Sequence, residues 1–167
     1  MYIEKDIMKV LYIHGYQSSP TEAKVNILKN EFDEVFAPLI DWDNDETRPN
    51  LFNDFVELIN KEKITHIIGS SMGGQMAFYL STFCNIKSLC FNPAFGYRYK
   101  DLNLSLNTDF TSEILITLGI NDDVIPNSVS TNFLLVNNIQ DKVNIQYLDM
   151  GHQVNTDIFE TQTKKFK

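Results

Sequence analysis

The stretch HIIGSSMGGQM, residues 66–76, contains two adjacent serines between glycines and includes the end of an apolar run. A nucleophile on a sharp turn from a strand into a helix needs small residues two positions before and two positions after it. Ser71 meets this requirement because Gly69 and Gly73 flank it, whereas bulky residues stand at the equivalent positions around Ser70. The pattern therefore selects Ser71 as the candidate nucleophile. The alternative is a glycine turn that only packs a helix closely against a strand.

Short β-rich runs alternate with longer amphipathic runs along the whole chain. Strands are predicted at 8–13, 34–37, 64–68, 87–91, 113–118 and 143–148. Helices are predicted at 22–30, 51–62, 73–83, 127–137 and 155–165. This alternation is typical of an α/β domain with a mostly parallel six-stranded sheet and helices on both faces. We expect one such domain over residues 1–167, with no insertion long enough for a separate lid domain.

The composition excludes several classes of protein. The net charge of −8 argues against nonspecific binding to nucleic acid or to an anionic membrane. No apolar run approaches the roughly 18 residues that a membrane-spanning helix needs, and the N-terminus does not read as a secretory signal. The two cysteines, Cys84 and Cys90, lie in apolar stretches and indicate a reducing, cytoplasmic setting. We expect no metal and no organic cofactor, and the oligomeric state is left open.

A serine hydroxyl is a poor nucleophile at neutral pH and needs a base, which is nearly always histidine. The chain contains three histidines, His14, His66 and His152. In a parallel sheet, sites form at the carboxyl ends of the strands. His152 follows the predicted strand 143–148 in the loop DMGHQ and is the favoured base. His66 lies inside a predicted strand and is expected to be structural or exposed.

The base needs a carboxylate to orient it. Asp122 follows the predicted strand 113–118 and is the favoured acid, with Asp123 as a near competitor and Asp149 as a distant one. An aspartate at this position could also serve only as a turn former. The chain order serine, aspartate, histidine is that of α/β-hydrolases.

The tetrahedral intermediate of acyl transfer needs two backbone N–H groups directed at its oxyanion. The residue after the nucleophile, Met72, supplies one. The loop after the first strand supplies the other, with the Tyr16 amide as the main candidate and Gln17 as the second. Gly15 permits a tight turn there. His14 is expected to order this loop by hydrogen bonding, or to be a plain loop histidine.

Several segments together resemble the YqiA/YcfP-like family of small bacterial α/β-hydrolase esterases. They are LYIHGYQSSP (11–20), IIGSSMGG (67–74), FNPAFGY (91–97), GINDDVIP (119–126) and MGH (150–152). The resemblance implies a minimal hydrolase core with esterase-type activity, in which Ser71 is the nucleophile, Asp122 the acid and His152 the base. It also places Tyr16 and Met72 at the oxyanion positions. The sequence differs from the family where FGYRY follows the Asn-Pro-Ala segment, a region that bears on substrate preference.

These observations predict a serine hydrolase that cleaves small or flexible acyl esters or thioesters through an acyl-enzyme. The alternatives are an acyltransferase that uses the same three residues and a binding protein that has lost the chemistry. The expected pocket walls come from the loops at the same edge of the sheet, namely Gln17, Trp42, Phe95, Tyr97 and Tyr99.

Overall fold

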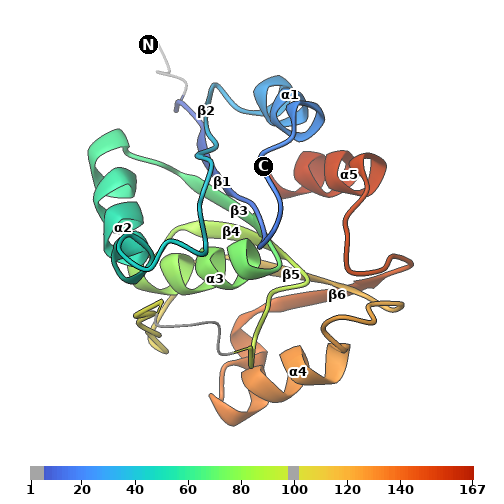
Figure 1. The fold of residues 1–167 in the computed structure, drawn as a ribbon. Helices are drawn as coiled ribbons and strands as arrows, with labels where there is room; N and C mark the ends of the chain where they lie inside the picture. Colours follow the sequence, from blue (N-terminus) through green and yellow to red (C-terminus); the bar gives the residue numbers. More distant parts are fainter. Residues whose placement is uncertain (1–5, 98–101) are drawn as a thin grey trace, which may run out of the picture.

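The fold is built on one six-stranded sheet, in which every neighbouring pair of strands is parallel (Figure 1). The computed structural model describes residues 6–97 and 102–167. The strand order is β2-β1-β3-β4-β5-β6. The bounds are β1 Lys9–Ile13, β2 Glu34–Phe36, β3 His66–Ser70, β4 Lys87–Phe91, β5 Ile114–Gly119 and β6 Asn144–Leu148. The predicted α/β class with six strands is confirmed.

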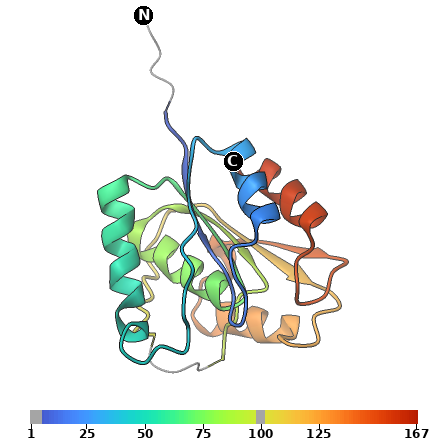
Figure 2. The same cartoon turned by 45° about the horizontal axis from the view of Figure 1, so that its top comes forward.

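Helices cover both faces of the sheet. On one face lie α1 (Glu22–Glu31) and α5 (Thr156–Phe166), which pack side by side (Figure 2). On the other lie α2 (Leu51–Glu62), α3 (Met72–Cys84) and α4 (Asn127–Val136). Two short 3-10 turns, η1 (Arg48–Asn50) and η2 (Gln140–Lys142), complete the described elements. Each face has its own hydrophobic cluster because the side chains of a buried strand point alternately to opposite faces.

The strand order places a topological switch point at β1. The chain passes from β1 to β2 on one side and then crosses to β3 on the other side of β1. In open parallel sheets, a crevice forms at the carboxyl ends of the strands where the order reverses. The fold therefore directs attention to the loops that leave β1 and β3.

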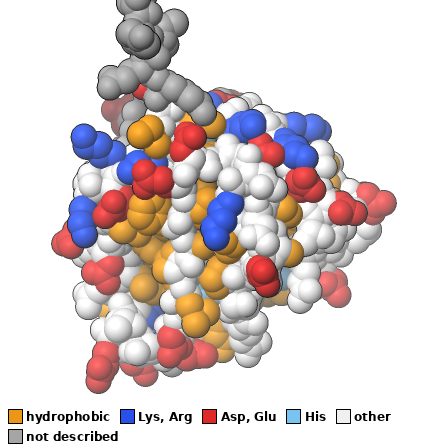
Figure 3. All heavy atoms as spheres, turned by 90° about the horizontal axis from the view of Figure 1, so that it is seen from above, with side chains coloured by type: hydrophobic (Ala, Val, Ile, Leu, Met, Phe, Trp, Pro, Cys, Tyr) orange, Lys and Arg blue, Asp and Glu red, His pale blue; other side chains and the backbone are white. Residues whose placement is uncertain are grey.

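Charged side chains of both signs are interspersed around the edges of one face of the molecule, with hydrophobic side chains between them (Figure 3). Across residues 6–97 and 102–167, no helix combines the length and the apolar character that crossing a bilayer requires.

His66 occupies the amino end of β3, because this strand starts at His66 and not at residue 64 as the sequence predicted. The hydroxyl of Thr65, the residue just before β3, accepts a hydrogen bond from the N–H of Lys9 and donates one to its C=O. The Thr65 side chain therefore bonds to the first residue of β1. The His66 side chain is buried between Phe32 and Phe166, whose ring centroids lie 5.2 and 5.5 Å from its own. His66 is therefore a structural residue at the edge of the sheet opposite to the switch-point crevice.

Burial, together with a smaller effect from the charge of Lys87, lowers the pKa of His66 from 6.5 to about 4. A lowered histidine pKa means that the unfolded chain takes up the proton first as the pH falls. The stabilising effect of neutral His66 is therefore present above pH 6.5 and is lost as the pH falls from 6.5 towards 4. Each unit of pKa corresponds to about 1.4 kcal/mol, so we expect a loss of about 3 kcal/mol over this range.

The variant His66→Phe keeps the aromatic packing and removes the titrating group. Urea unfolding at a series of pH values should give a flatter dependence of stability on pH for His66→Phe than for the wild type between pH 6.5 and 4. Because His14 and His152 are present in both proteins, their contributions cancel in the difference. Parallel curves for the two proteins would contradict the assignment.

Candidate active site

Ser71 lies on a sharp turn between β3 and α3, with φ 55° and ψ −117°. Backbone hydrogen bonds hold this unusual conformation. The Ser71 N–H donates to the carbonyl of Phe91 at 2.9 Å, and the Ser71 carbonyl accepts from the N–H groups of Gln75 and Ala94 at 2.9 and 3.0 Å. A non-glycine residue at positive φ costs roughly 1–3 kcal/mol and persists only where the surrounding structure enforces it. The turn therefore fixes the Ser71 side chain at the carboxyl edge of the sheet.

The glycines on either side of Ser71 lie against backbone atoms with no space for a side chain. A Cβ atom on Gly69 would lie 2.1 Å from the carbonyl oxygen of Gly73. A Cβ atom on Gly73 would lie 2.0 Å from the carbonyl oxygen of Ile13, at the end of β1. These two contacts explain why the sequence has glycine two positions before and two positions after Ser71.

Three side chains from three different loops form a continuous hydrogen-bonded chain at this edge. The His152 Nε2 atom lies 2.9 Å from Ser71 Oγ, and His152 Nδ1 lies 2.9 Å from Asp122 Oδ2. Because a carboxylate only accepts hydrogen bonds, Nδ1 carries the proton and Nε2 is the acceptor for the serine hydroxyl. The Asp122 side chain is only 1% exposed. This arrangement allows the imidazole to take the proton of Ser71 while a buried carboxylate stabilises the resulting positive charge.

The other two aspartates considered from the sequence lie elsewhere. Asp123 is exposed, and Asp149 accepts a hydrogen bond from the side chain of Asn121 at 2.7 Å. The second carboxylate oxygen of Asp122 accepts from the N–H groups of Val124 and Ile125 at 2.9 and 2.8 Å. The turn-forming role and the contact with His152 therefore belong to the same carboxylate, and the turn holds it in place.

Asn92 is a buried residue of the site that was not among the residues predicted from the sequence. Its side-chain amide donates to the carbonyls of Gly151 and His152 at 3.0 and 2.9 Å, and its Oδ1 accepts from the N–H of Gly119 at 2.7 Å. These bonds join the end of β4 to the end of β5 and to the loop that carries His152. Asn92 belongs to the Asn-Pro-Ala segment that contributed to the family resemblance, and that segment could have indicated a role for it.

The loop after β1 is held from within by two buried side chains. The N–H of Ile40 donates to His14 Nε2 at 2.8 Å, so the other ring nitrogen carries the proton and donates to the Gly15 carbonyl at 2.7 Å. Burial lowers the pKa of His14 and favours this neutral form. The indole N–H of Trp42 donates to the same carbonyl at 3.1 Å. His14 thus bonds to both ends of this loop segment, which fits the first of the two roles that the sequence left open.

Two cavities lie on either side of Ser71 and His152, and Tyr16 and Gln17 line both. One of about 400 Å³, here called the apolar lobe, is completed by Met72, Ala94, Tyr97, Val124 and Ile125. The other, of about 390 Å³ and here called the polar lobe, is completed by Gly15, Ser18, Thr21, Lys24, Ser70, Gln153, Val154, Asn155 and Thr156. The hydroxyl of Ser71 is thus bordered by two spaces of contrasting character. A further cavity, beside α4, reaches neither Ser71 nor His152.

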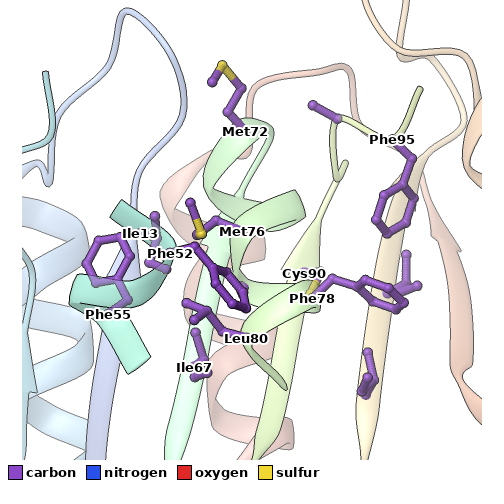
Figure 4. Close-up of a cluster of buried hydrophobic side chains, with 14 of the residues drawn as sticks. Ile13, Phe52, Phe55, Ile67, Met72, Met76, Phe78, Leu80, Cys90 and Phe95 are labelled. Atoms are coloured by element: carbon purple, nitrogen blue, oxygen red, sulfur yellow. The ribbon is translucent and has the colours of Figure 1, made fainter. Parts of the chain in front are cut away.

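Two of the predicted pocket walls are wrong. Phe95 is fully buried and stacks on Phe133, with ring centroids 4.2 Å apart, and its ring edge meets Phe78 (Figure 4). Trp42 is 2% exposed and directs its indole N–H at the Gly15 carbonyl. Both are core residues because the large apolar area of an aromatic ring favours burial wherever the fold offers it. Gln17 and Tyr97 do line the cavities, and Tyr99 lies outside the described residues.

The sequence model of a family described as "Uncharacterised protein family (UPF0227)" matches residues 9–109. The match confirms the resemblance predicted from the sequence. It includes the loop after β1, the Ser71 turn and Asn92, whereas Asp122 and His152 lie beyond it.

Solved structures with the same fold include several hydrolases. A Xanthomonas campestris protein assigned to the α/β-hydrolase superfamily has 15% identity and a TM-score of 0.67, over 95% of this chain and 98% of its own. An esterase from Pyrococcus furiosus has 17% identity and a TM-score of 0.69, over 95% and 80% of the two chains. A monoacylglycerol lipase from Paleococcus ferrophilus has 10% identity and a TM-score of 0.74, over 95% and 93%. The fold of this chain is that of the α/β-hydrolases.

The contact between Gly73 and Ile13 predicts a severe effect of a single methyl group. In Gly73→Ala, the added Cβ meets a backbone oxygen at 2.0 Å, which no side-chain rotation can relieve. Overpacking of a core costs about 1–3 kcal/mol, and we expect a loss at the upper end of that range or failure to fold. Urea unfolding followed by circular dichroism measures it.

Gly151→Ala is the matched control, because its Cβ would meet its nearest neighbour, the Asn121 carbonyl oxygen, only at 3.7 Å. Its φ also lies outside the left-handed region. Its stability should stay within about 0.5 kcal/mol of the wild type. Equal stability of the two alanine variants would overturn the steric account.

Proposed function

The chain belongs to the uncharacterised protein family UPF0227, and on that premise we propose that it is a serine hydrolase that cleaves carboxylic esters. The observation that carries the proposal is the hydrogen-bonded chain from Asp122 through His152 to Ser71, with both distances at 2.9 Å. Its fold supports the proposal, since the structural neighbours include an esterase and a lipase.

In the proposed acylation step, Ser71 Oγ attacks the ester carbonyl carbon while His152 Nε2 takes the hydroxyl proton. Asp122 keeps the proton of His152 on Nδ1 and stabilises the imidazolium. The carbonyl π bond opens to give a tetrahedral oxyanion. When this intermediate collapses, the bond to the leaving oxygen or sulfur breaks, and His152 passes its proton to that atom.

In the proposed deacylation step, a water molecule attacks the acyl-enzyme. His152 Nε2 takes a proton from the water, a second tetrahedral intermediate forms, and its collapse returns the proton to Ser71 and releases the carboxylic acid. Every proton transfer in this cycle uses the hydroxyl and imidazole groups of the chain itself, so the reaction requires no metal and no organic cofactor.

The amides of Met72 and Tyr16 are the proposed donors to the oxyanion. Met72 is the first residue of α3, where the N–H groups have no partner within the helix and the helix dipole favours negative charge. The Tyr16 amide belongs to the same peptide unit as the Gly15 carbonyl. In a trans peptide, the C=O and N–H groups point in opposite directions. Because Trp42 and His14 hold that carbonyl toward the core, the Tyr16 N–H is directed away from the core, on the side where Tyr16 borders both lobes.

The two lobes favour small or flexible substrates. Each lobe has a volume of about 400 Å³ or less and opens at Ser71, so an acyl group on one side and a leaving group on the other can both reach the nucleophile. The apolar lobe suits an uncharged acyl chain, because burial of each CH₂ group contributes about 0.8 kcal/mol. We therefore propose short to medium acyl esters or thioesters as substrates.

Covalent labelling tests the nucleophile. A fluorophosphonate probe should label the wild type and Ser70→Ala at comparable rates and should leave Ser71→Ala unlabelled, because only the Ser71 hydroxyl contacts His152. His152→Ala should lower the labelling rate by at least about a thousandfold. Gel fluorescence and intact-protein mass spectrometry measure the extent and the rate of labelling of each protein. Labelling that survives in Ser71→Ala contradicts the proposal.

Trp42→Phe tests the orientation of the Tyr16 amide, because it keeps an aromatic ring in the core and removes the N–H that holds the Gly15 carbonyl. Loss of one oxyanion donor lowers kcat by about 10²–10³. A donor that is only misdirected should cost less, and we expect kcat for 4-nitrophenyl butyrate to fall about tenfold with little change in KM.

Phe55→Leu is a suitable control for a general loss of packing, since Phe55 belongs to the same hydrophobic cluster as Trp42. It should lower the melting temperature and leave kcat near that of the wild type. If Phe55→Leu lowers kcat as much as Trp42→Phe does, Trp42 acts through packing alone.

A further inference from the structure

Lys24 lines the polar lobe and has no carboxylate partner among the described residues. Its side chain is half-buried on the first turns of α1, and its Nζ lies 5.3 Å from the ring centroid of the fully buried Phe159. Within the described part of the chain, no aspartate or glutamate lies within 4.0 Å of this ammonium group. Burial alone lowers the pKa of Lys24, with no opposing effect from an acidic neighbour.

The absence of a partner is informative because carboxylates are abundant in this protein. The chain has 22 acidic residues against 14 basic ones. Lysines such as Lys9, Lys87 and Lys167 have acidic partners. The other described lysines without one are exposed to solvent, whereas Lys24 is partly buried; they are Lys29, Lys63, Lys142 and Lys165. A partly desolvated cation without an anionic partner is unfavourable, and the contact with the Phe159 ring offsets this only in part. An anionic ligand in the polar lobe would remove that cost.

The rest of the polar lobe also favours negative charge. None of its lining residues is acidic. Thr21 and Asn155, the N-cap residues of α1 and α5, both line it. The amino ends of two helices therefore face this cavity, and their dipoles add to the positive potential of Lys24. The apolar lobe contains no lysine or arginine among its lining residues, so the positive potential is confined to one side of Ser71.

The position of the lobe relative to His152 indicates which end of the substrate it receives. The four residues that directly follow His152, from 153 to 156, all line the polar lobe, whereas the apolar lobe includes only His152 from this loop. The leaving group must receive its proton from the base of the catalytic chain. The polar lobe therefore suits the leaving alcohol or thiol, and the apolar lobe is left for the acyl chain.

From these observations, we infer that the polar lobe is a subsite for an anionic group, a carboxylate or a phosphate, on the leaving alcohol or thiol, and that Lys24 binds it. This inference rests on the proposed ester hydrolysis and specifies its substrate class: an uncharged acyl chain joined to an anionic leaving group. The ammonium group of Lys24 would pair with the anion while Thr21 and Asn155 border it.

Two chromogenic esters with the same acyl group test the subsite. They are 2-nitrophenyl butyrate and 3-butyryloxy-4-nitrobenzoate, which differ only by a carboxylate on the leaving group. For the wild type, we expect kcat/KM to be about fivefold higher for the anionic ester, as for a partly exposed ion pair of about 1 kcal/mol. The ratio should fall to about one in Lys24→Gln and below one in Lys24→Glu.

The control variant is Lys29→Gln, which removes the same charge from an exposed position of the same helix that lines neither lobe. Lys29→Gln should keep the wild-type ratio of kcat/KM for the anionic ester to kcat/KM for the neutral ester. An unchanged ratio in both Lys24 variants overturns the inference. So does a preference for mono(4-nitrophenyl) succinate over 4-nitrophenyl butyrate that depends on Lys24, because it would put the anion on the acyl side.

A binding measurement separates this inference from the proposed function. The affinities of Ser71→Ala for the two intact esters, measured by calorimetry with and without Lys24→Gln, report the charge preference without any turnover. If the wild type hydrolyses neither ester, the proposed function fails, while the ratio of these affinities still decides on Lys24. Equal affinities for the two esters in Ser71→Ala contradict the subsite.

Discussion

The close contact between Gly73 and the carbonyl oxygen of Ile13 is the constraint on which the site depends. It brings the first turn of α3 directly against the end of β1. As a result, the Ser71 turn and the loop that carries Gly15 and Tyr16 lie together at the switch point of the sheet. A side chain at Gly73 would separate them. The hydroxyl of Ser71 and both proposed oxyanion donors therefore owe their proximity to a contact between two backbone segments.

The parallel sheet supplies the remaining partners because all its strands end at the same edge. Asp122 follows β5 and His152 follows β6, so two residues far apart from Ser71 in sequence arrive beside it. Asn92 then ties the end of β4 to both of these loops. Buried hydrogen bonds of this kind limit the freedom of loops that would otherwise be mobile. The geometry between the three side chains is thus set by backbone contacts around them as well as by their own bonds.

The sequence allowed the architecture to be predicted well, since the β-rich and amphipathic runs predicted six strands and five helices whose boundaries all lie within two residues of those observed. Ser71 could be distinguished from Ser70 because the steric rule for the turn is local. The roles of Trp42 and Phe95 could not be predicted, because each depends on contacts between segments distant in sequence. The place of an aromatic residue in a loop at the carboxyl edge of the sheet does not show whether its side chain faces the cavity or the core. The charge of Lys24 could be assigned a place only once α1 and α5 were seen side by side.

The proposed mechanism requires Ser71 to be the nucleophile and the Tyr16 and Met72 amides to hold the oxyanion. A crystal structure of the protein after reaction with a small alkyl fluorophosphonate tests both requirements at once. We expect phosphorus bonded to Ser71 Oγ and the phosphoryl oxygen within hydrogen-bonding distance of both amide nitrogens. Phosphorus on another residue, or a phosphoryl oxygen directed away from both amides, would contradict the proposed mechanism.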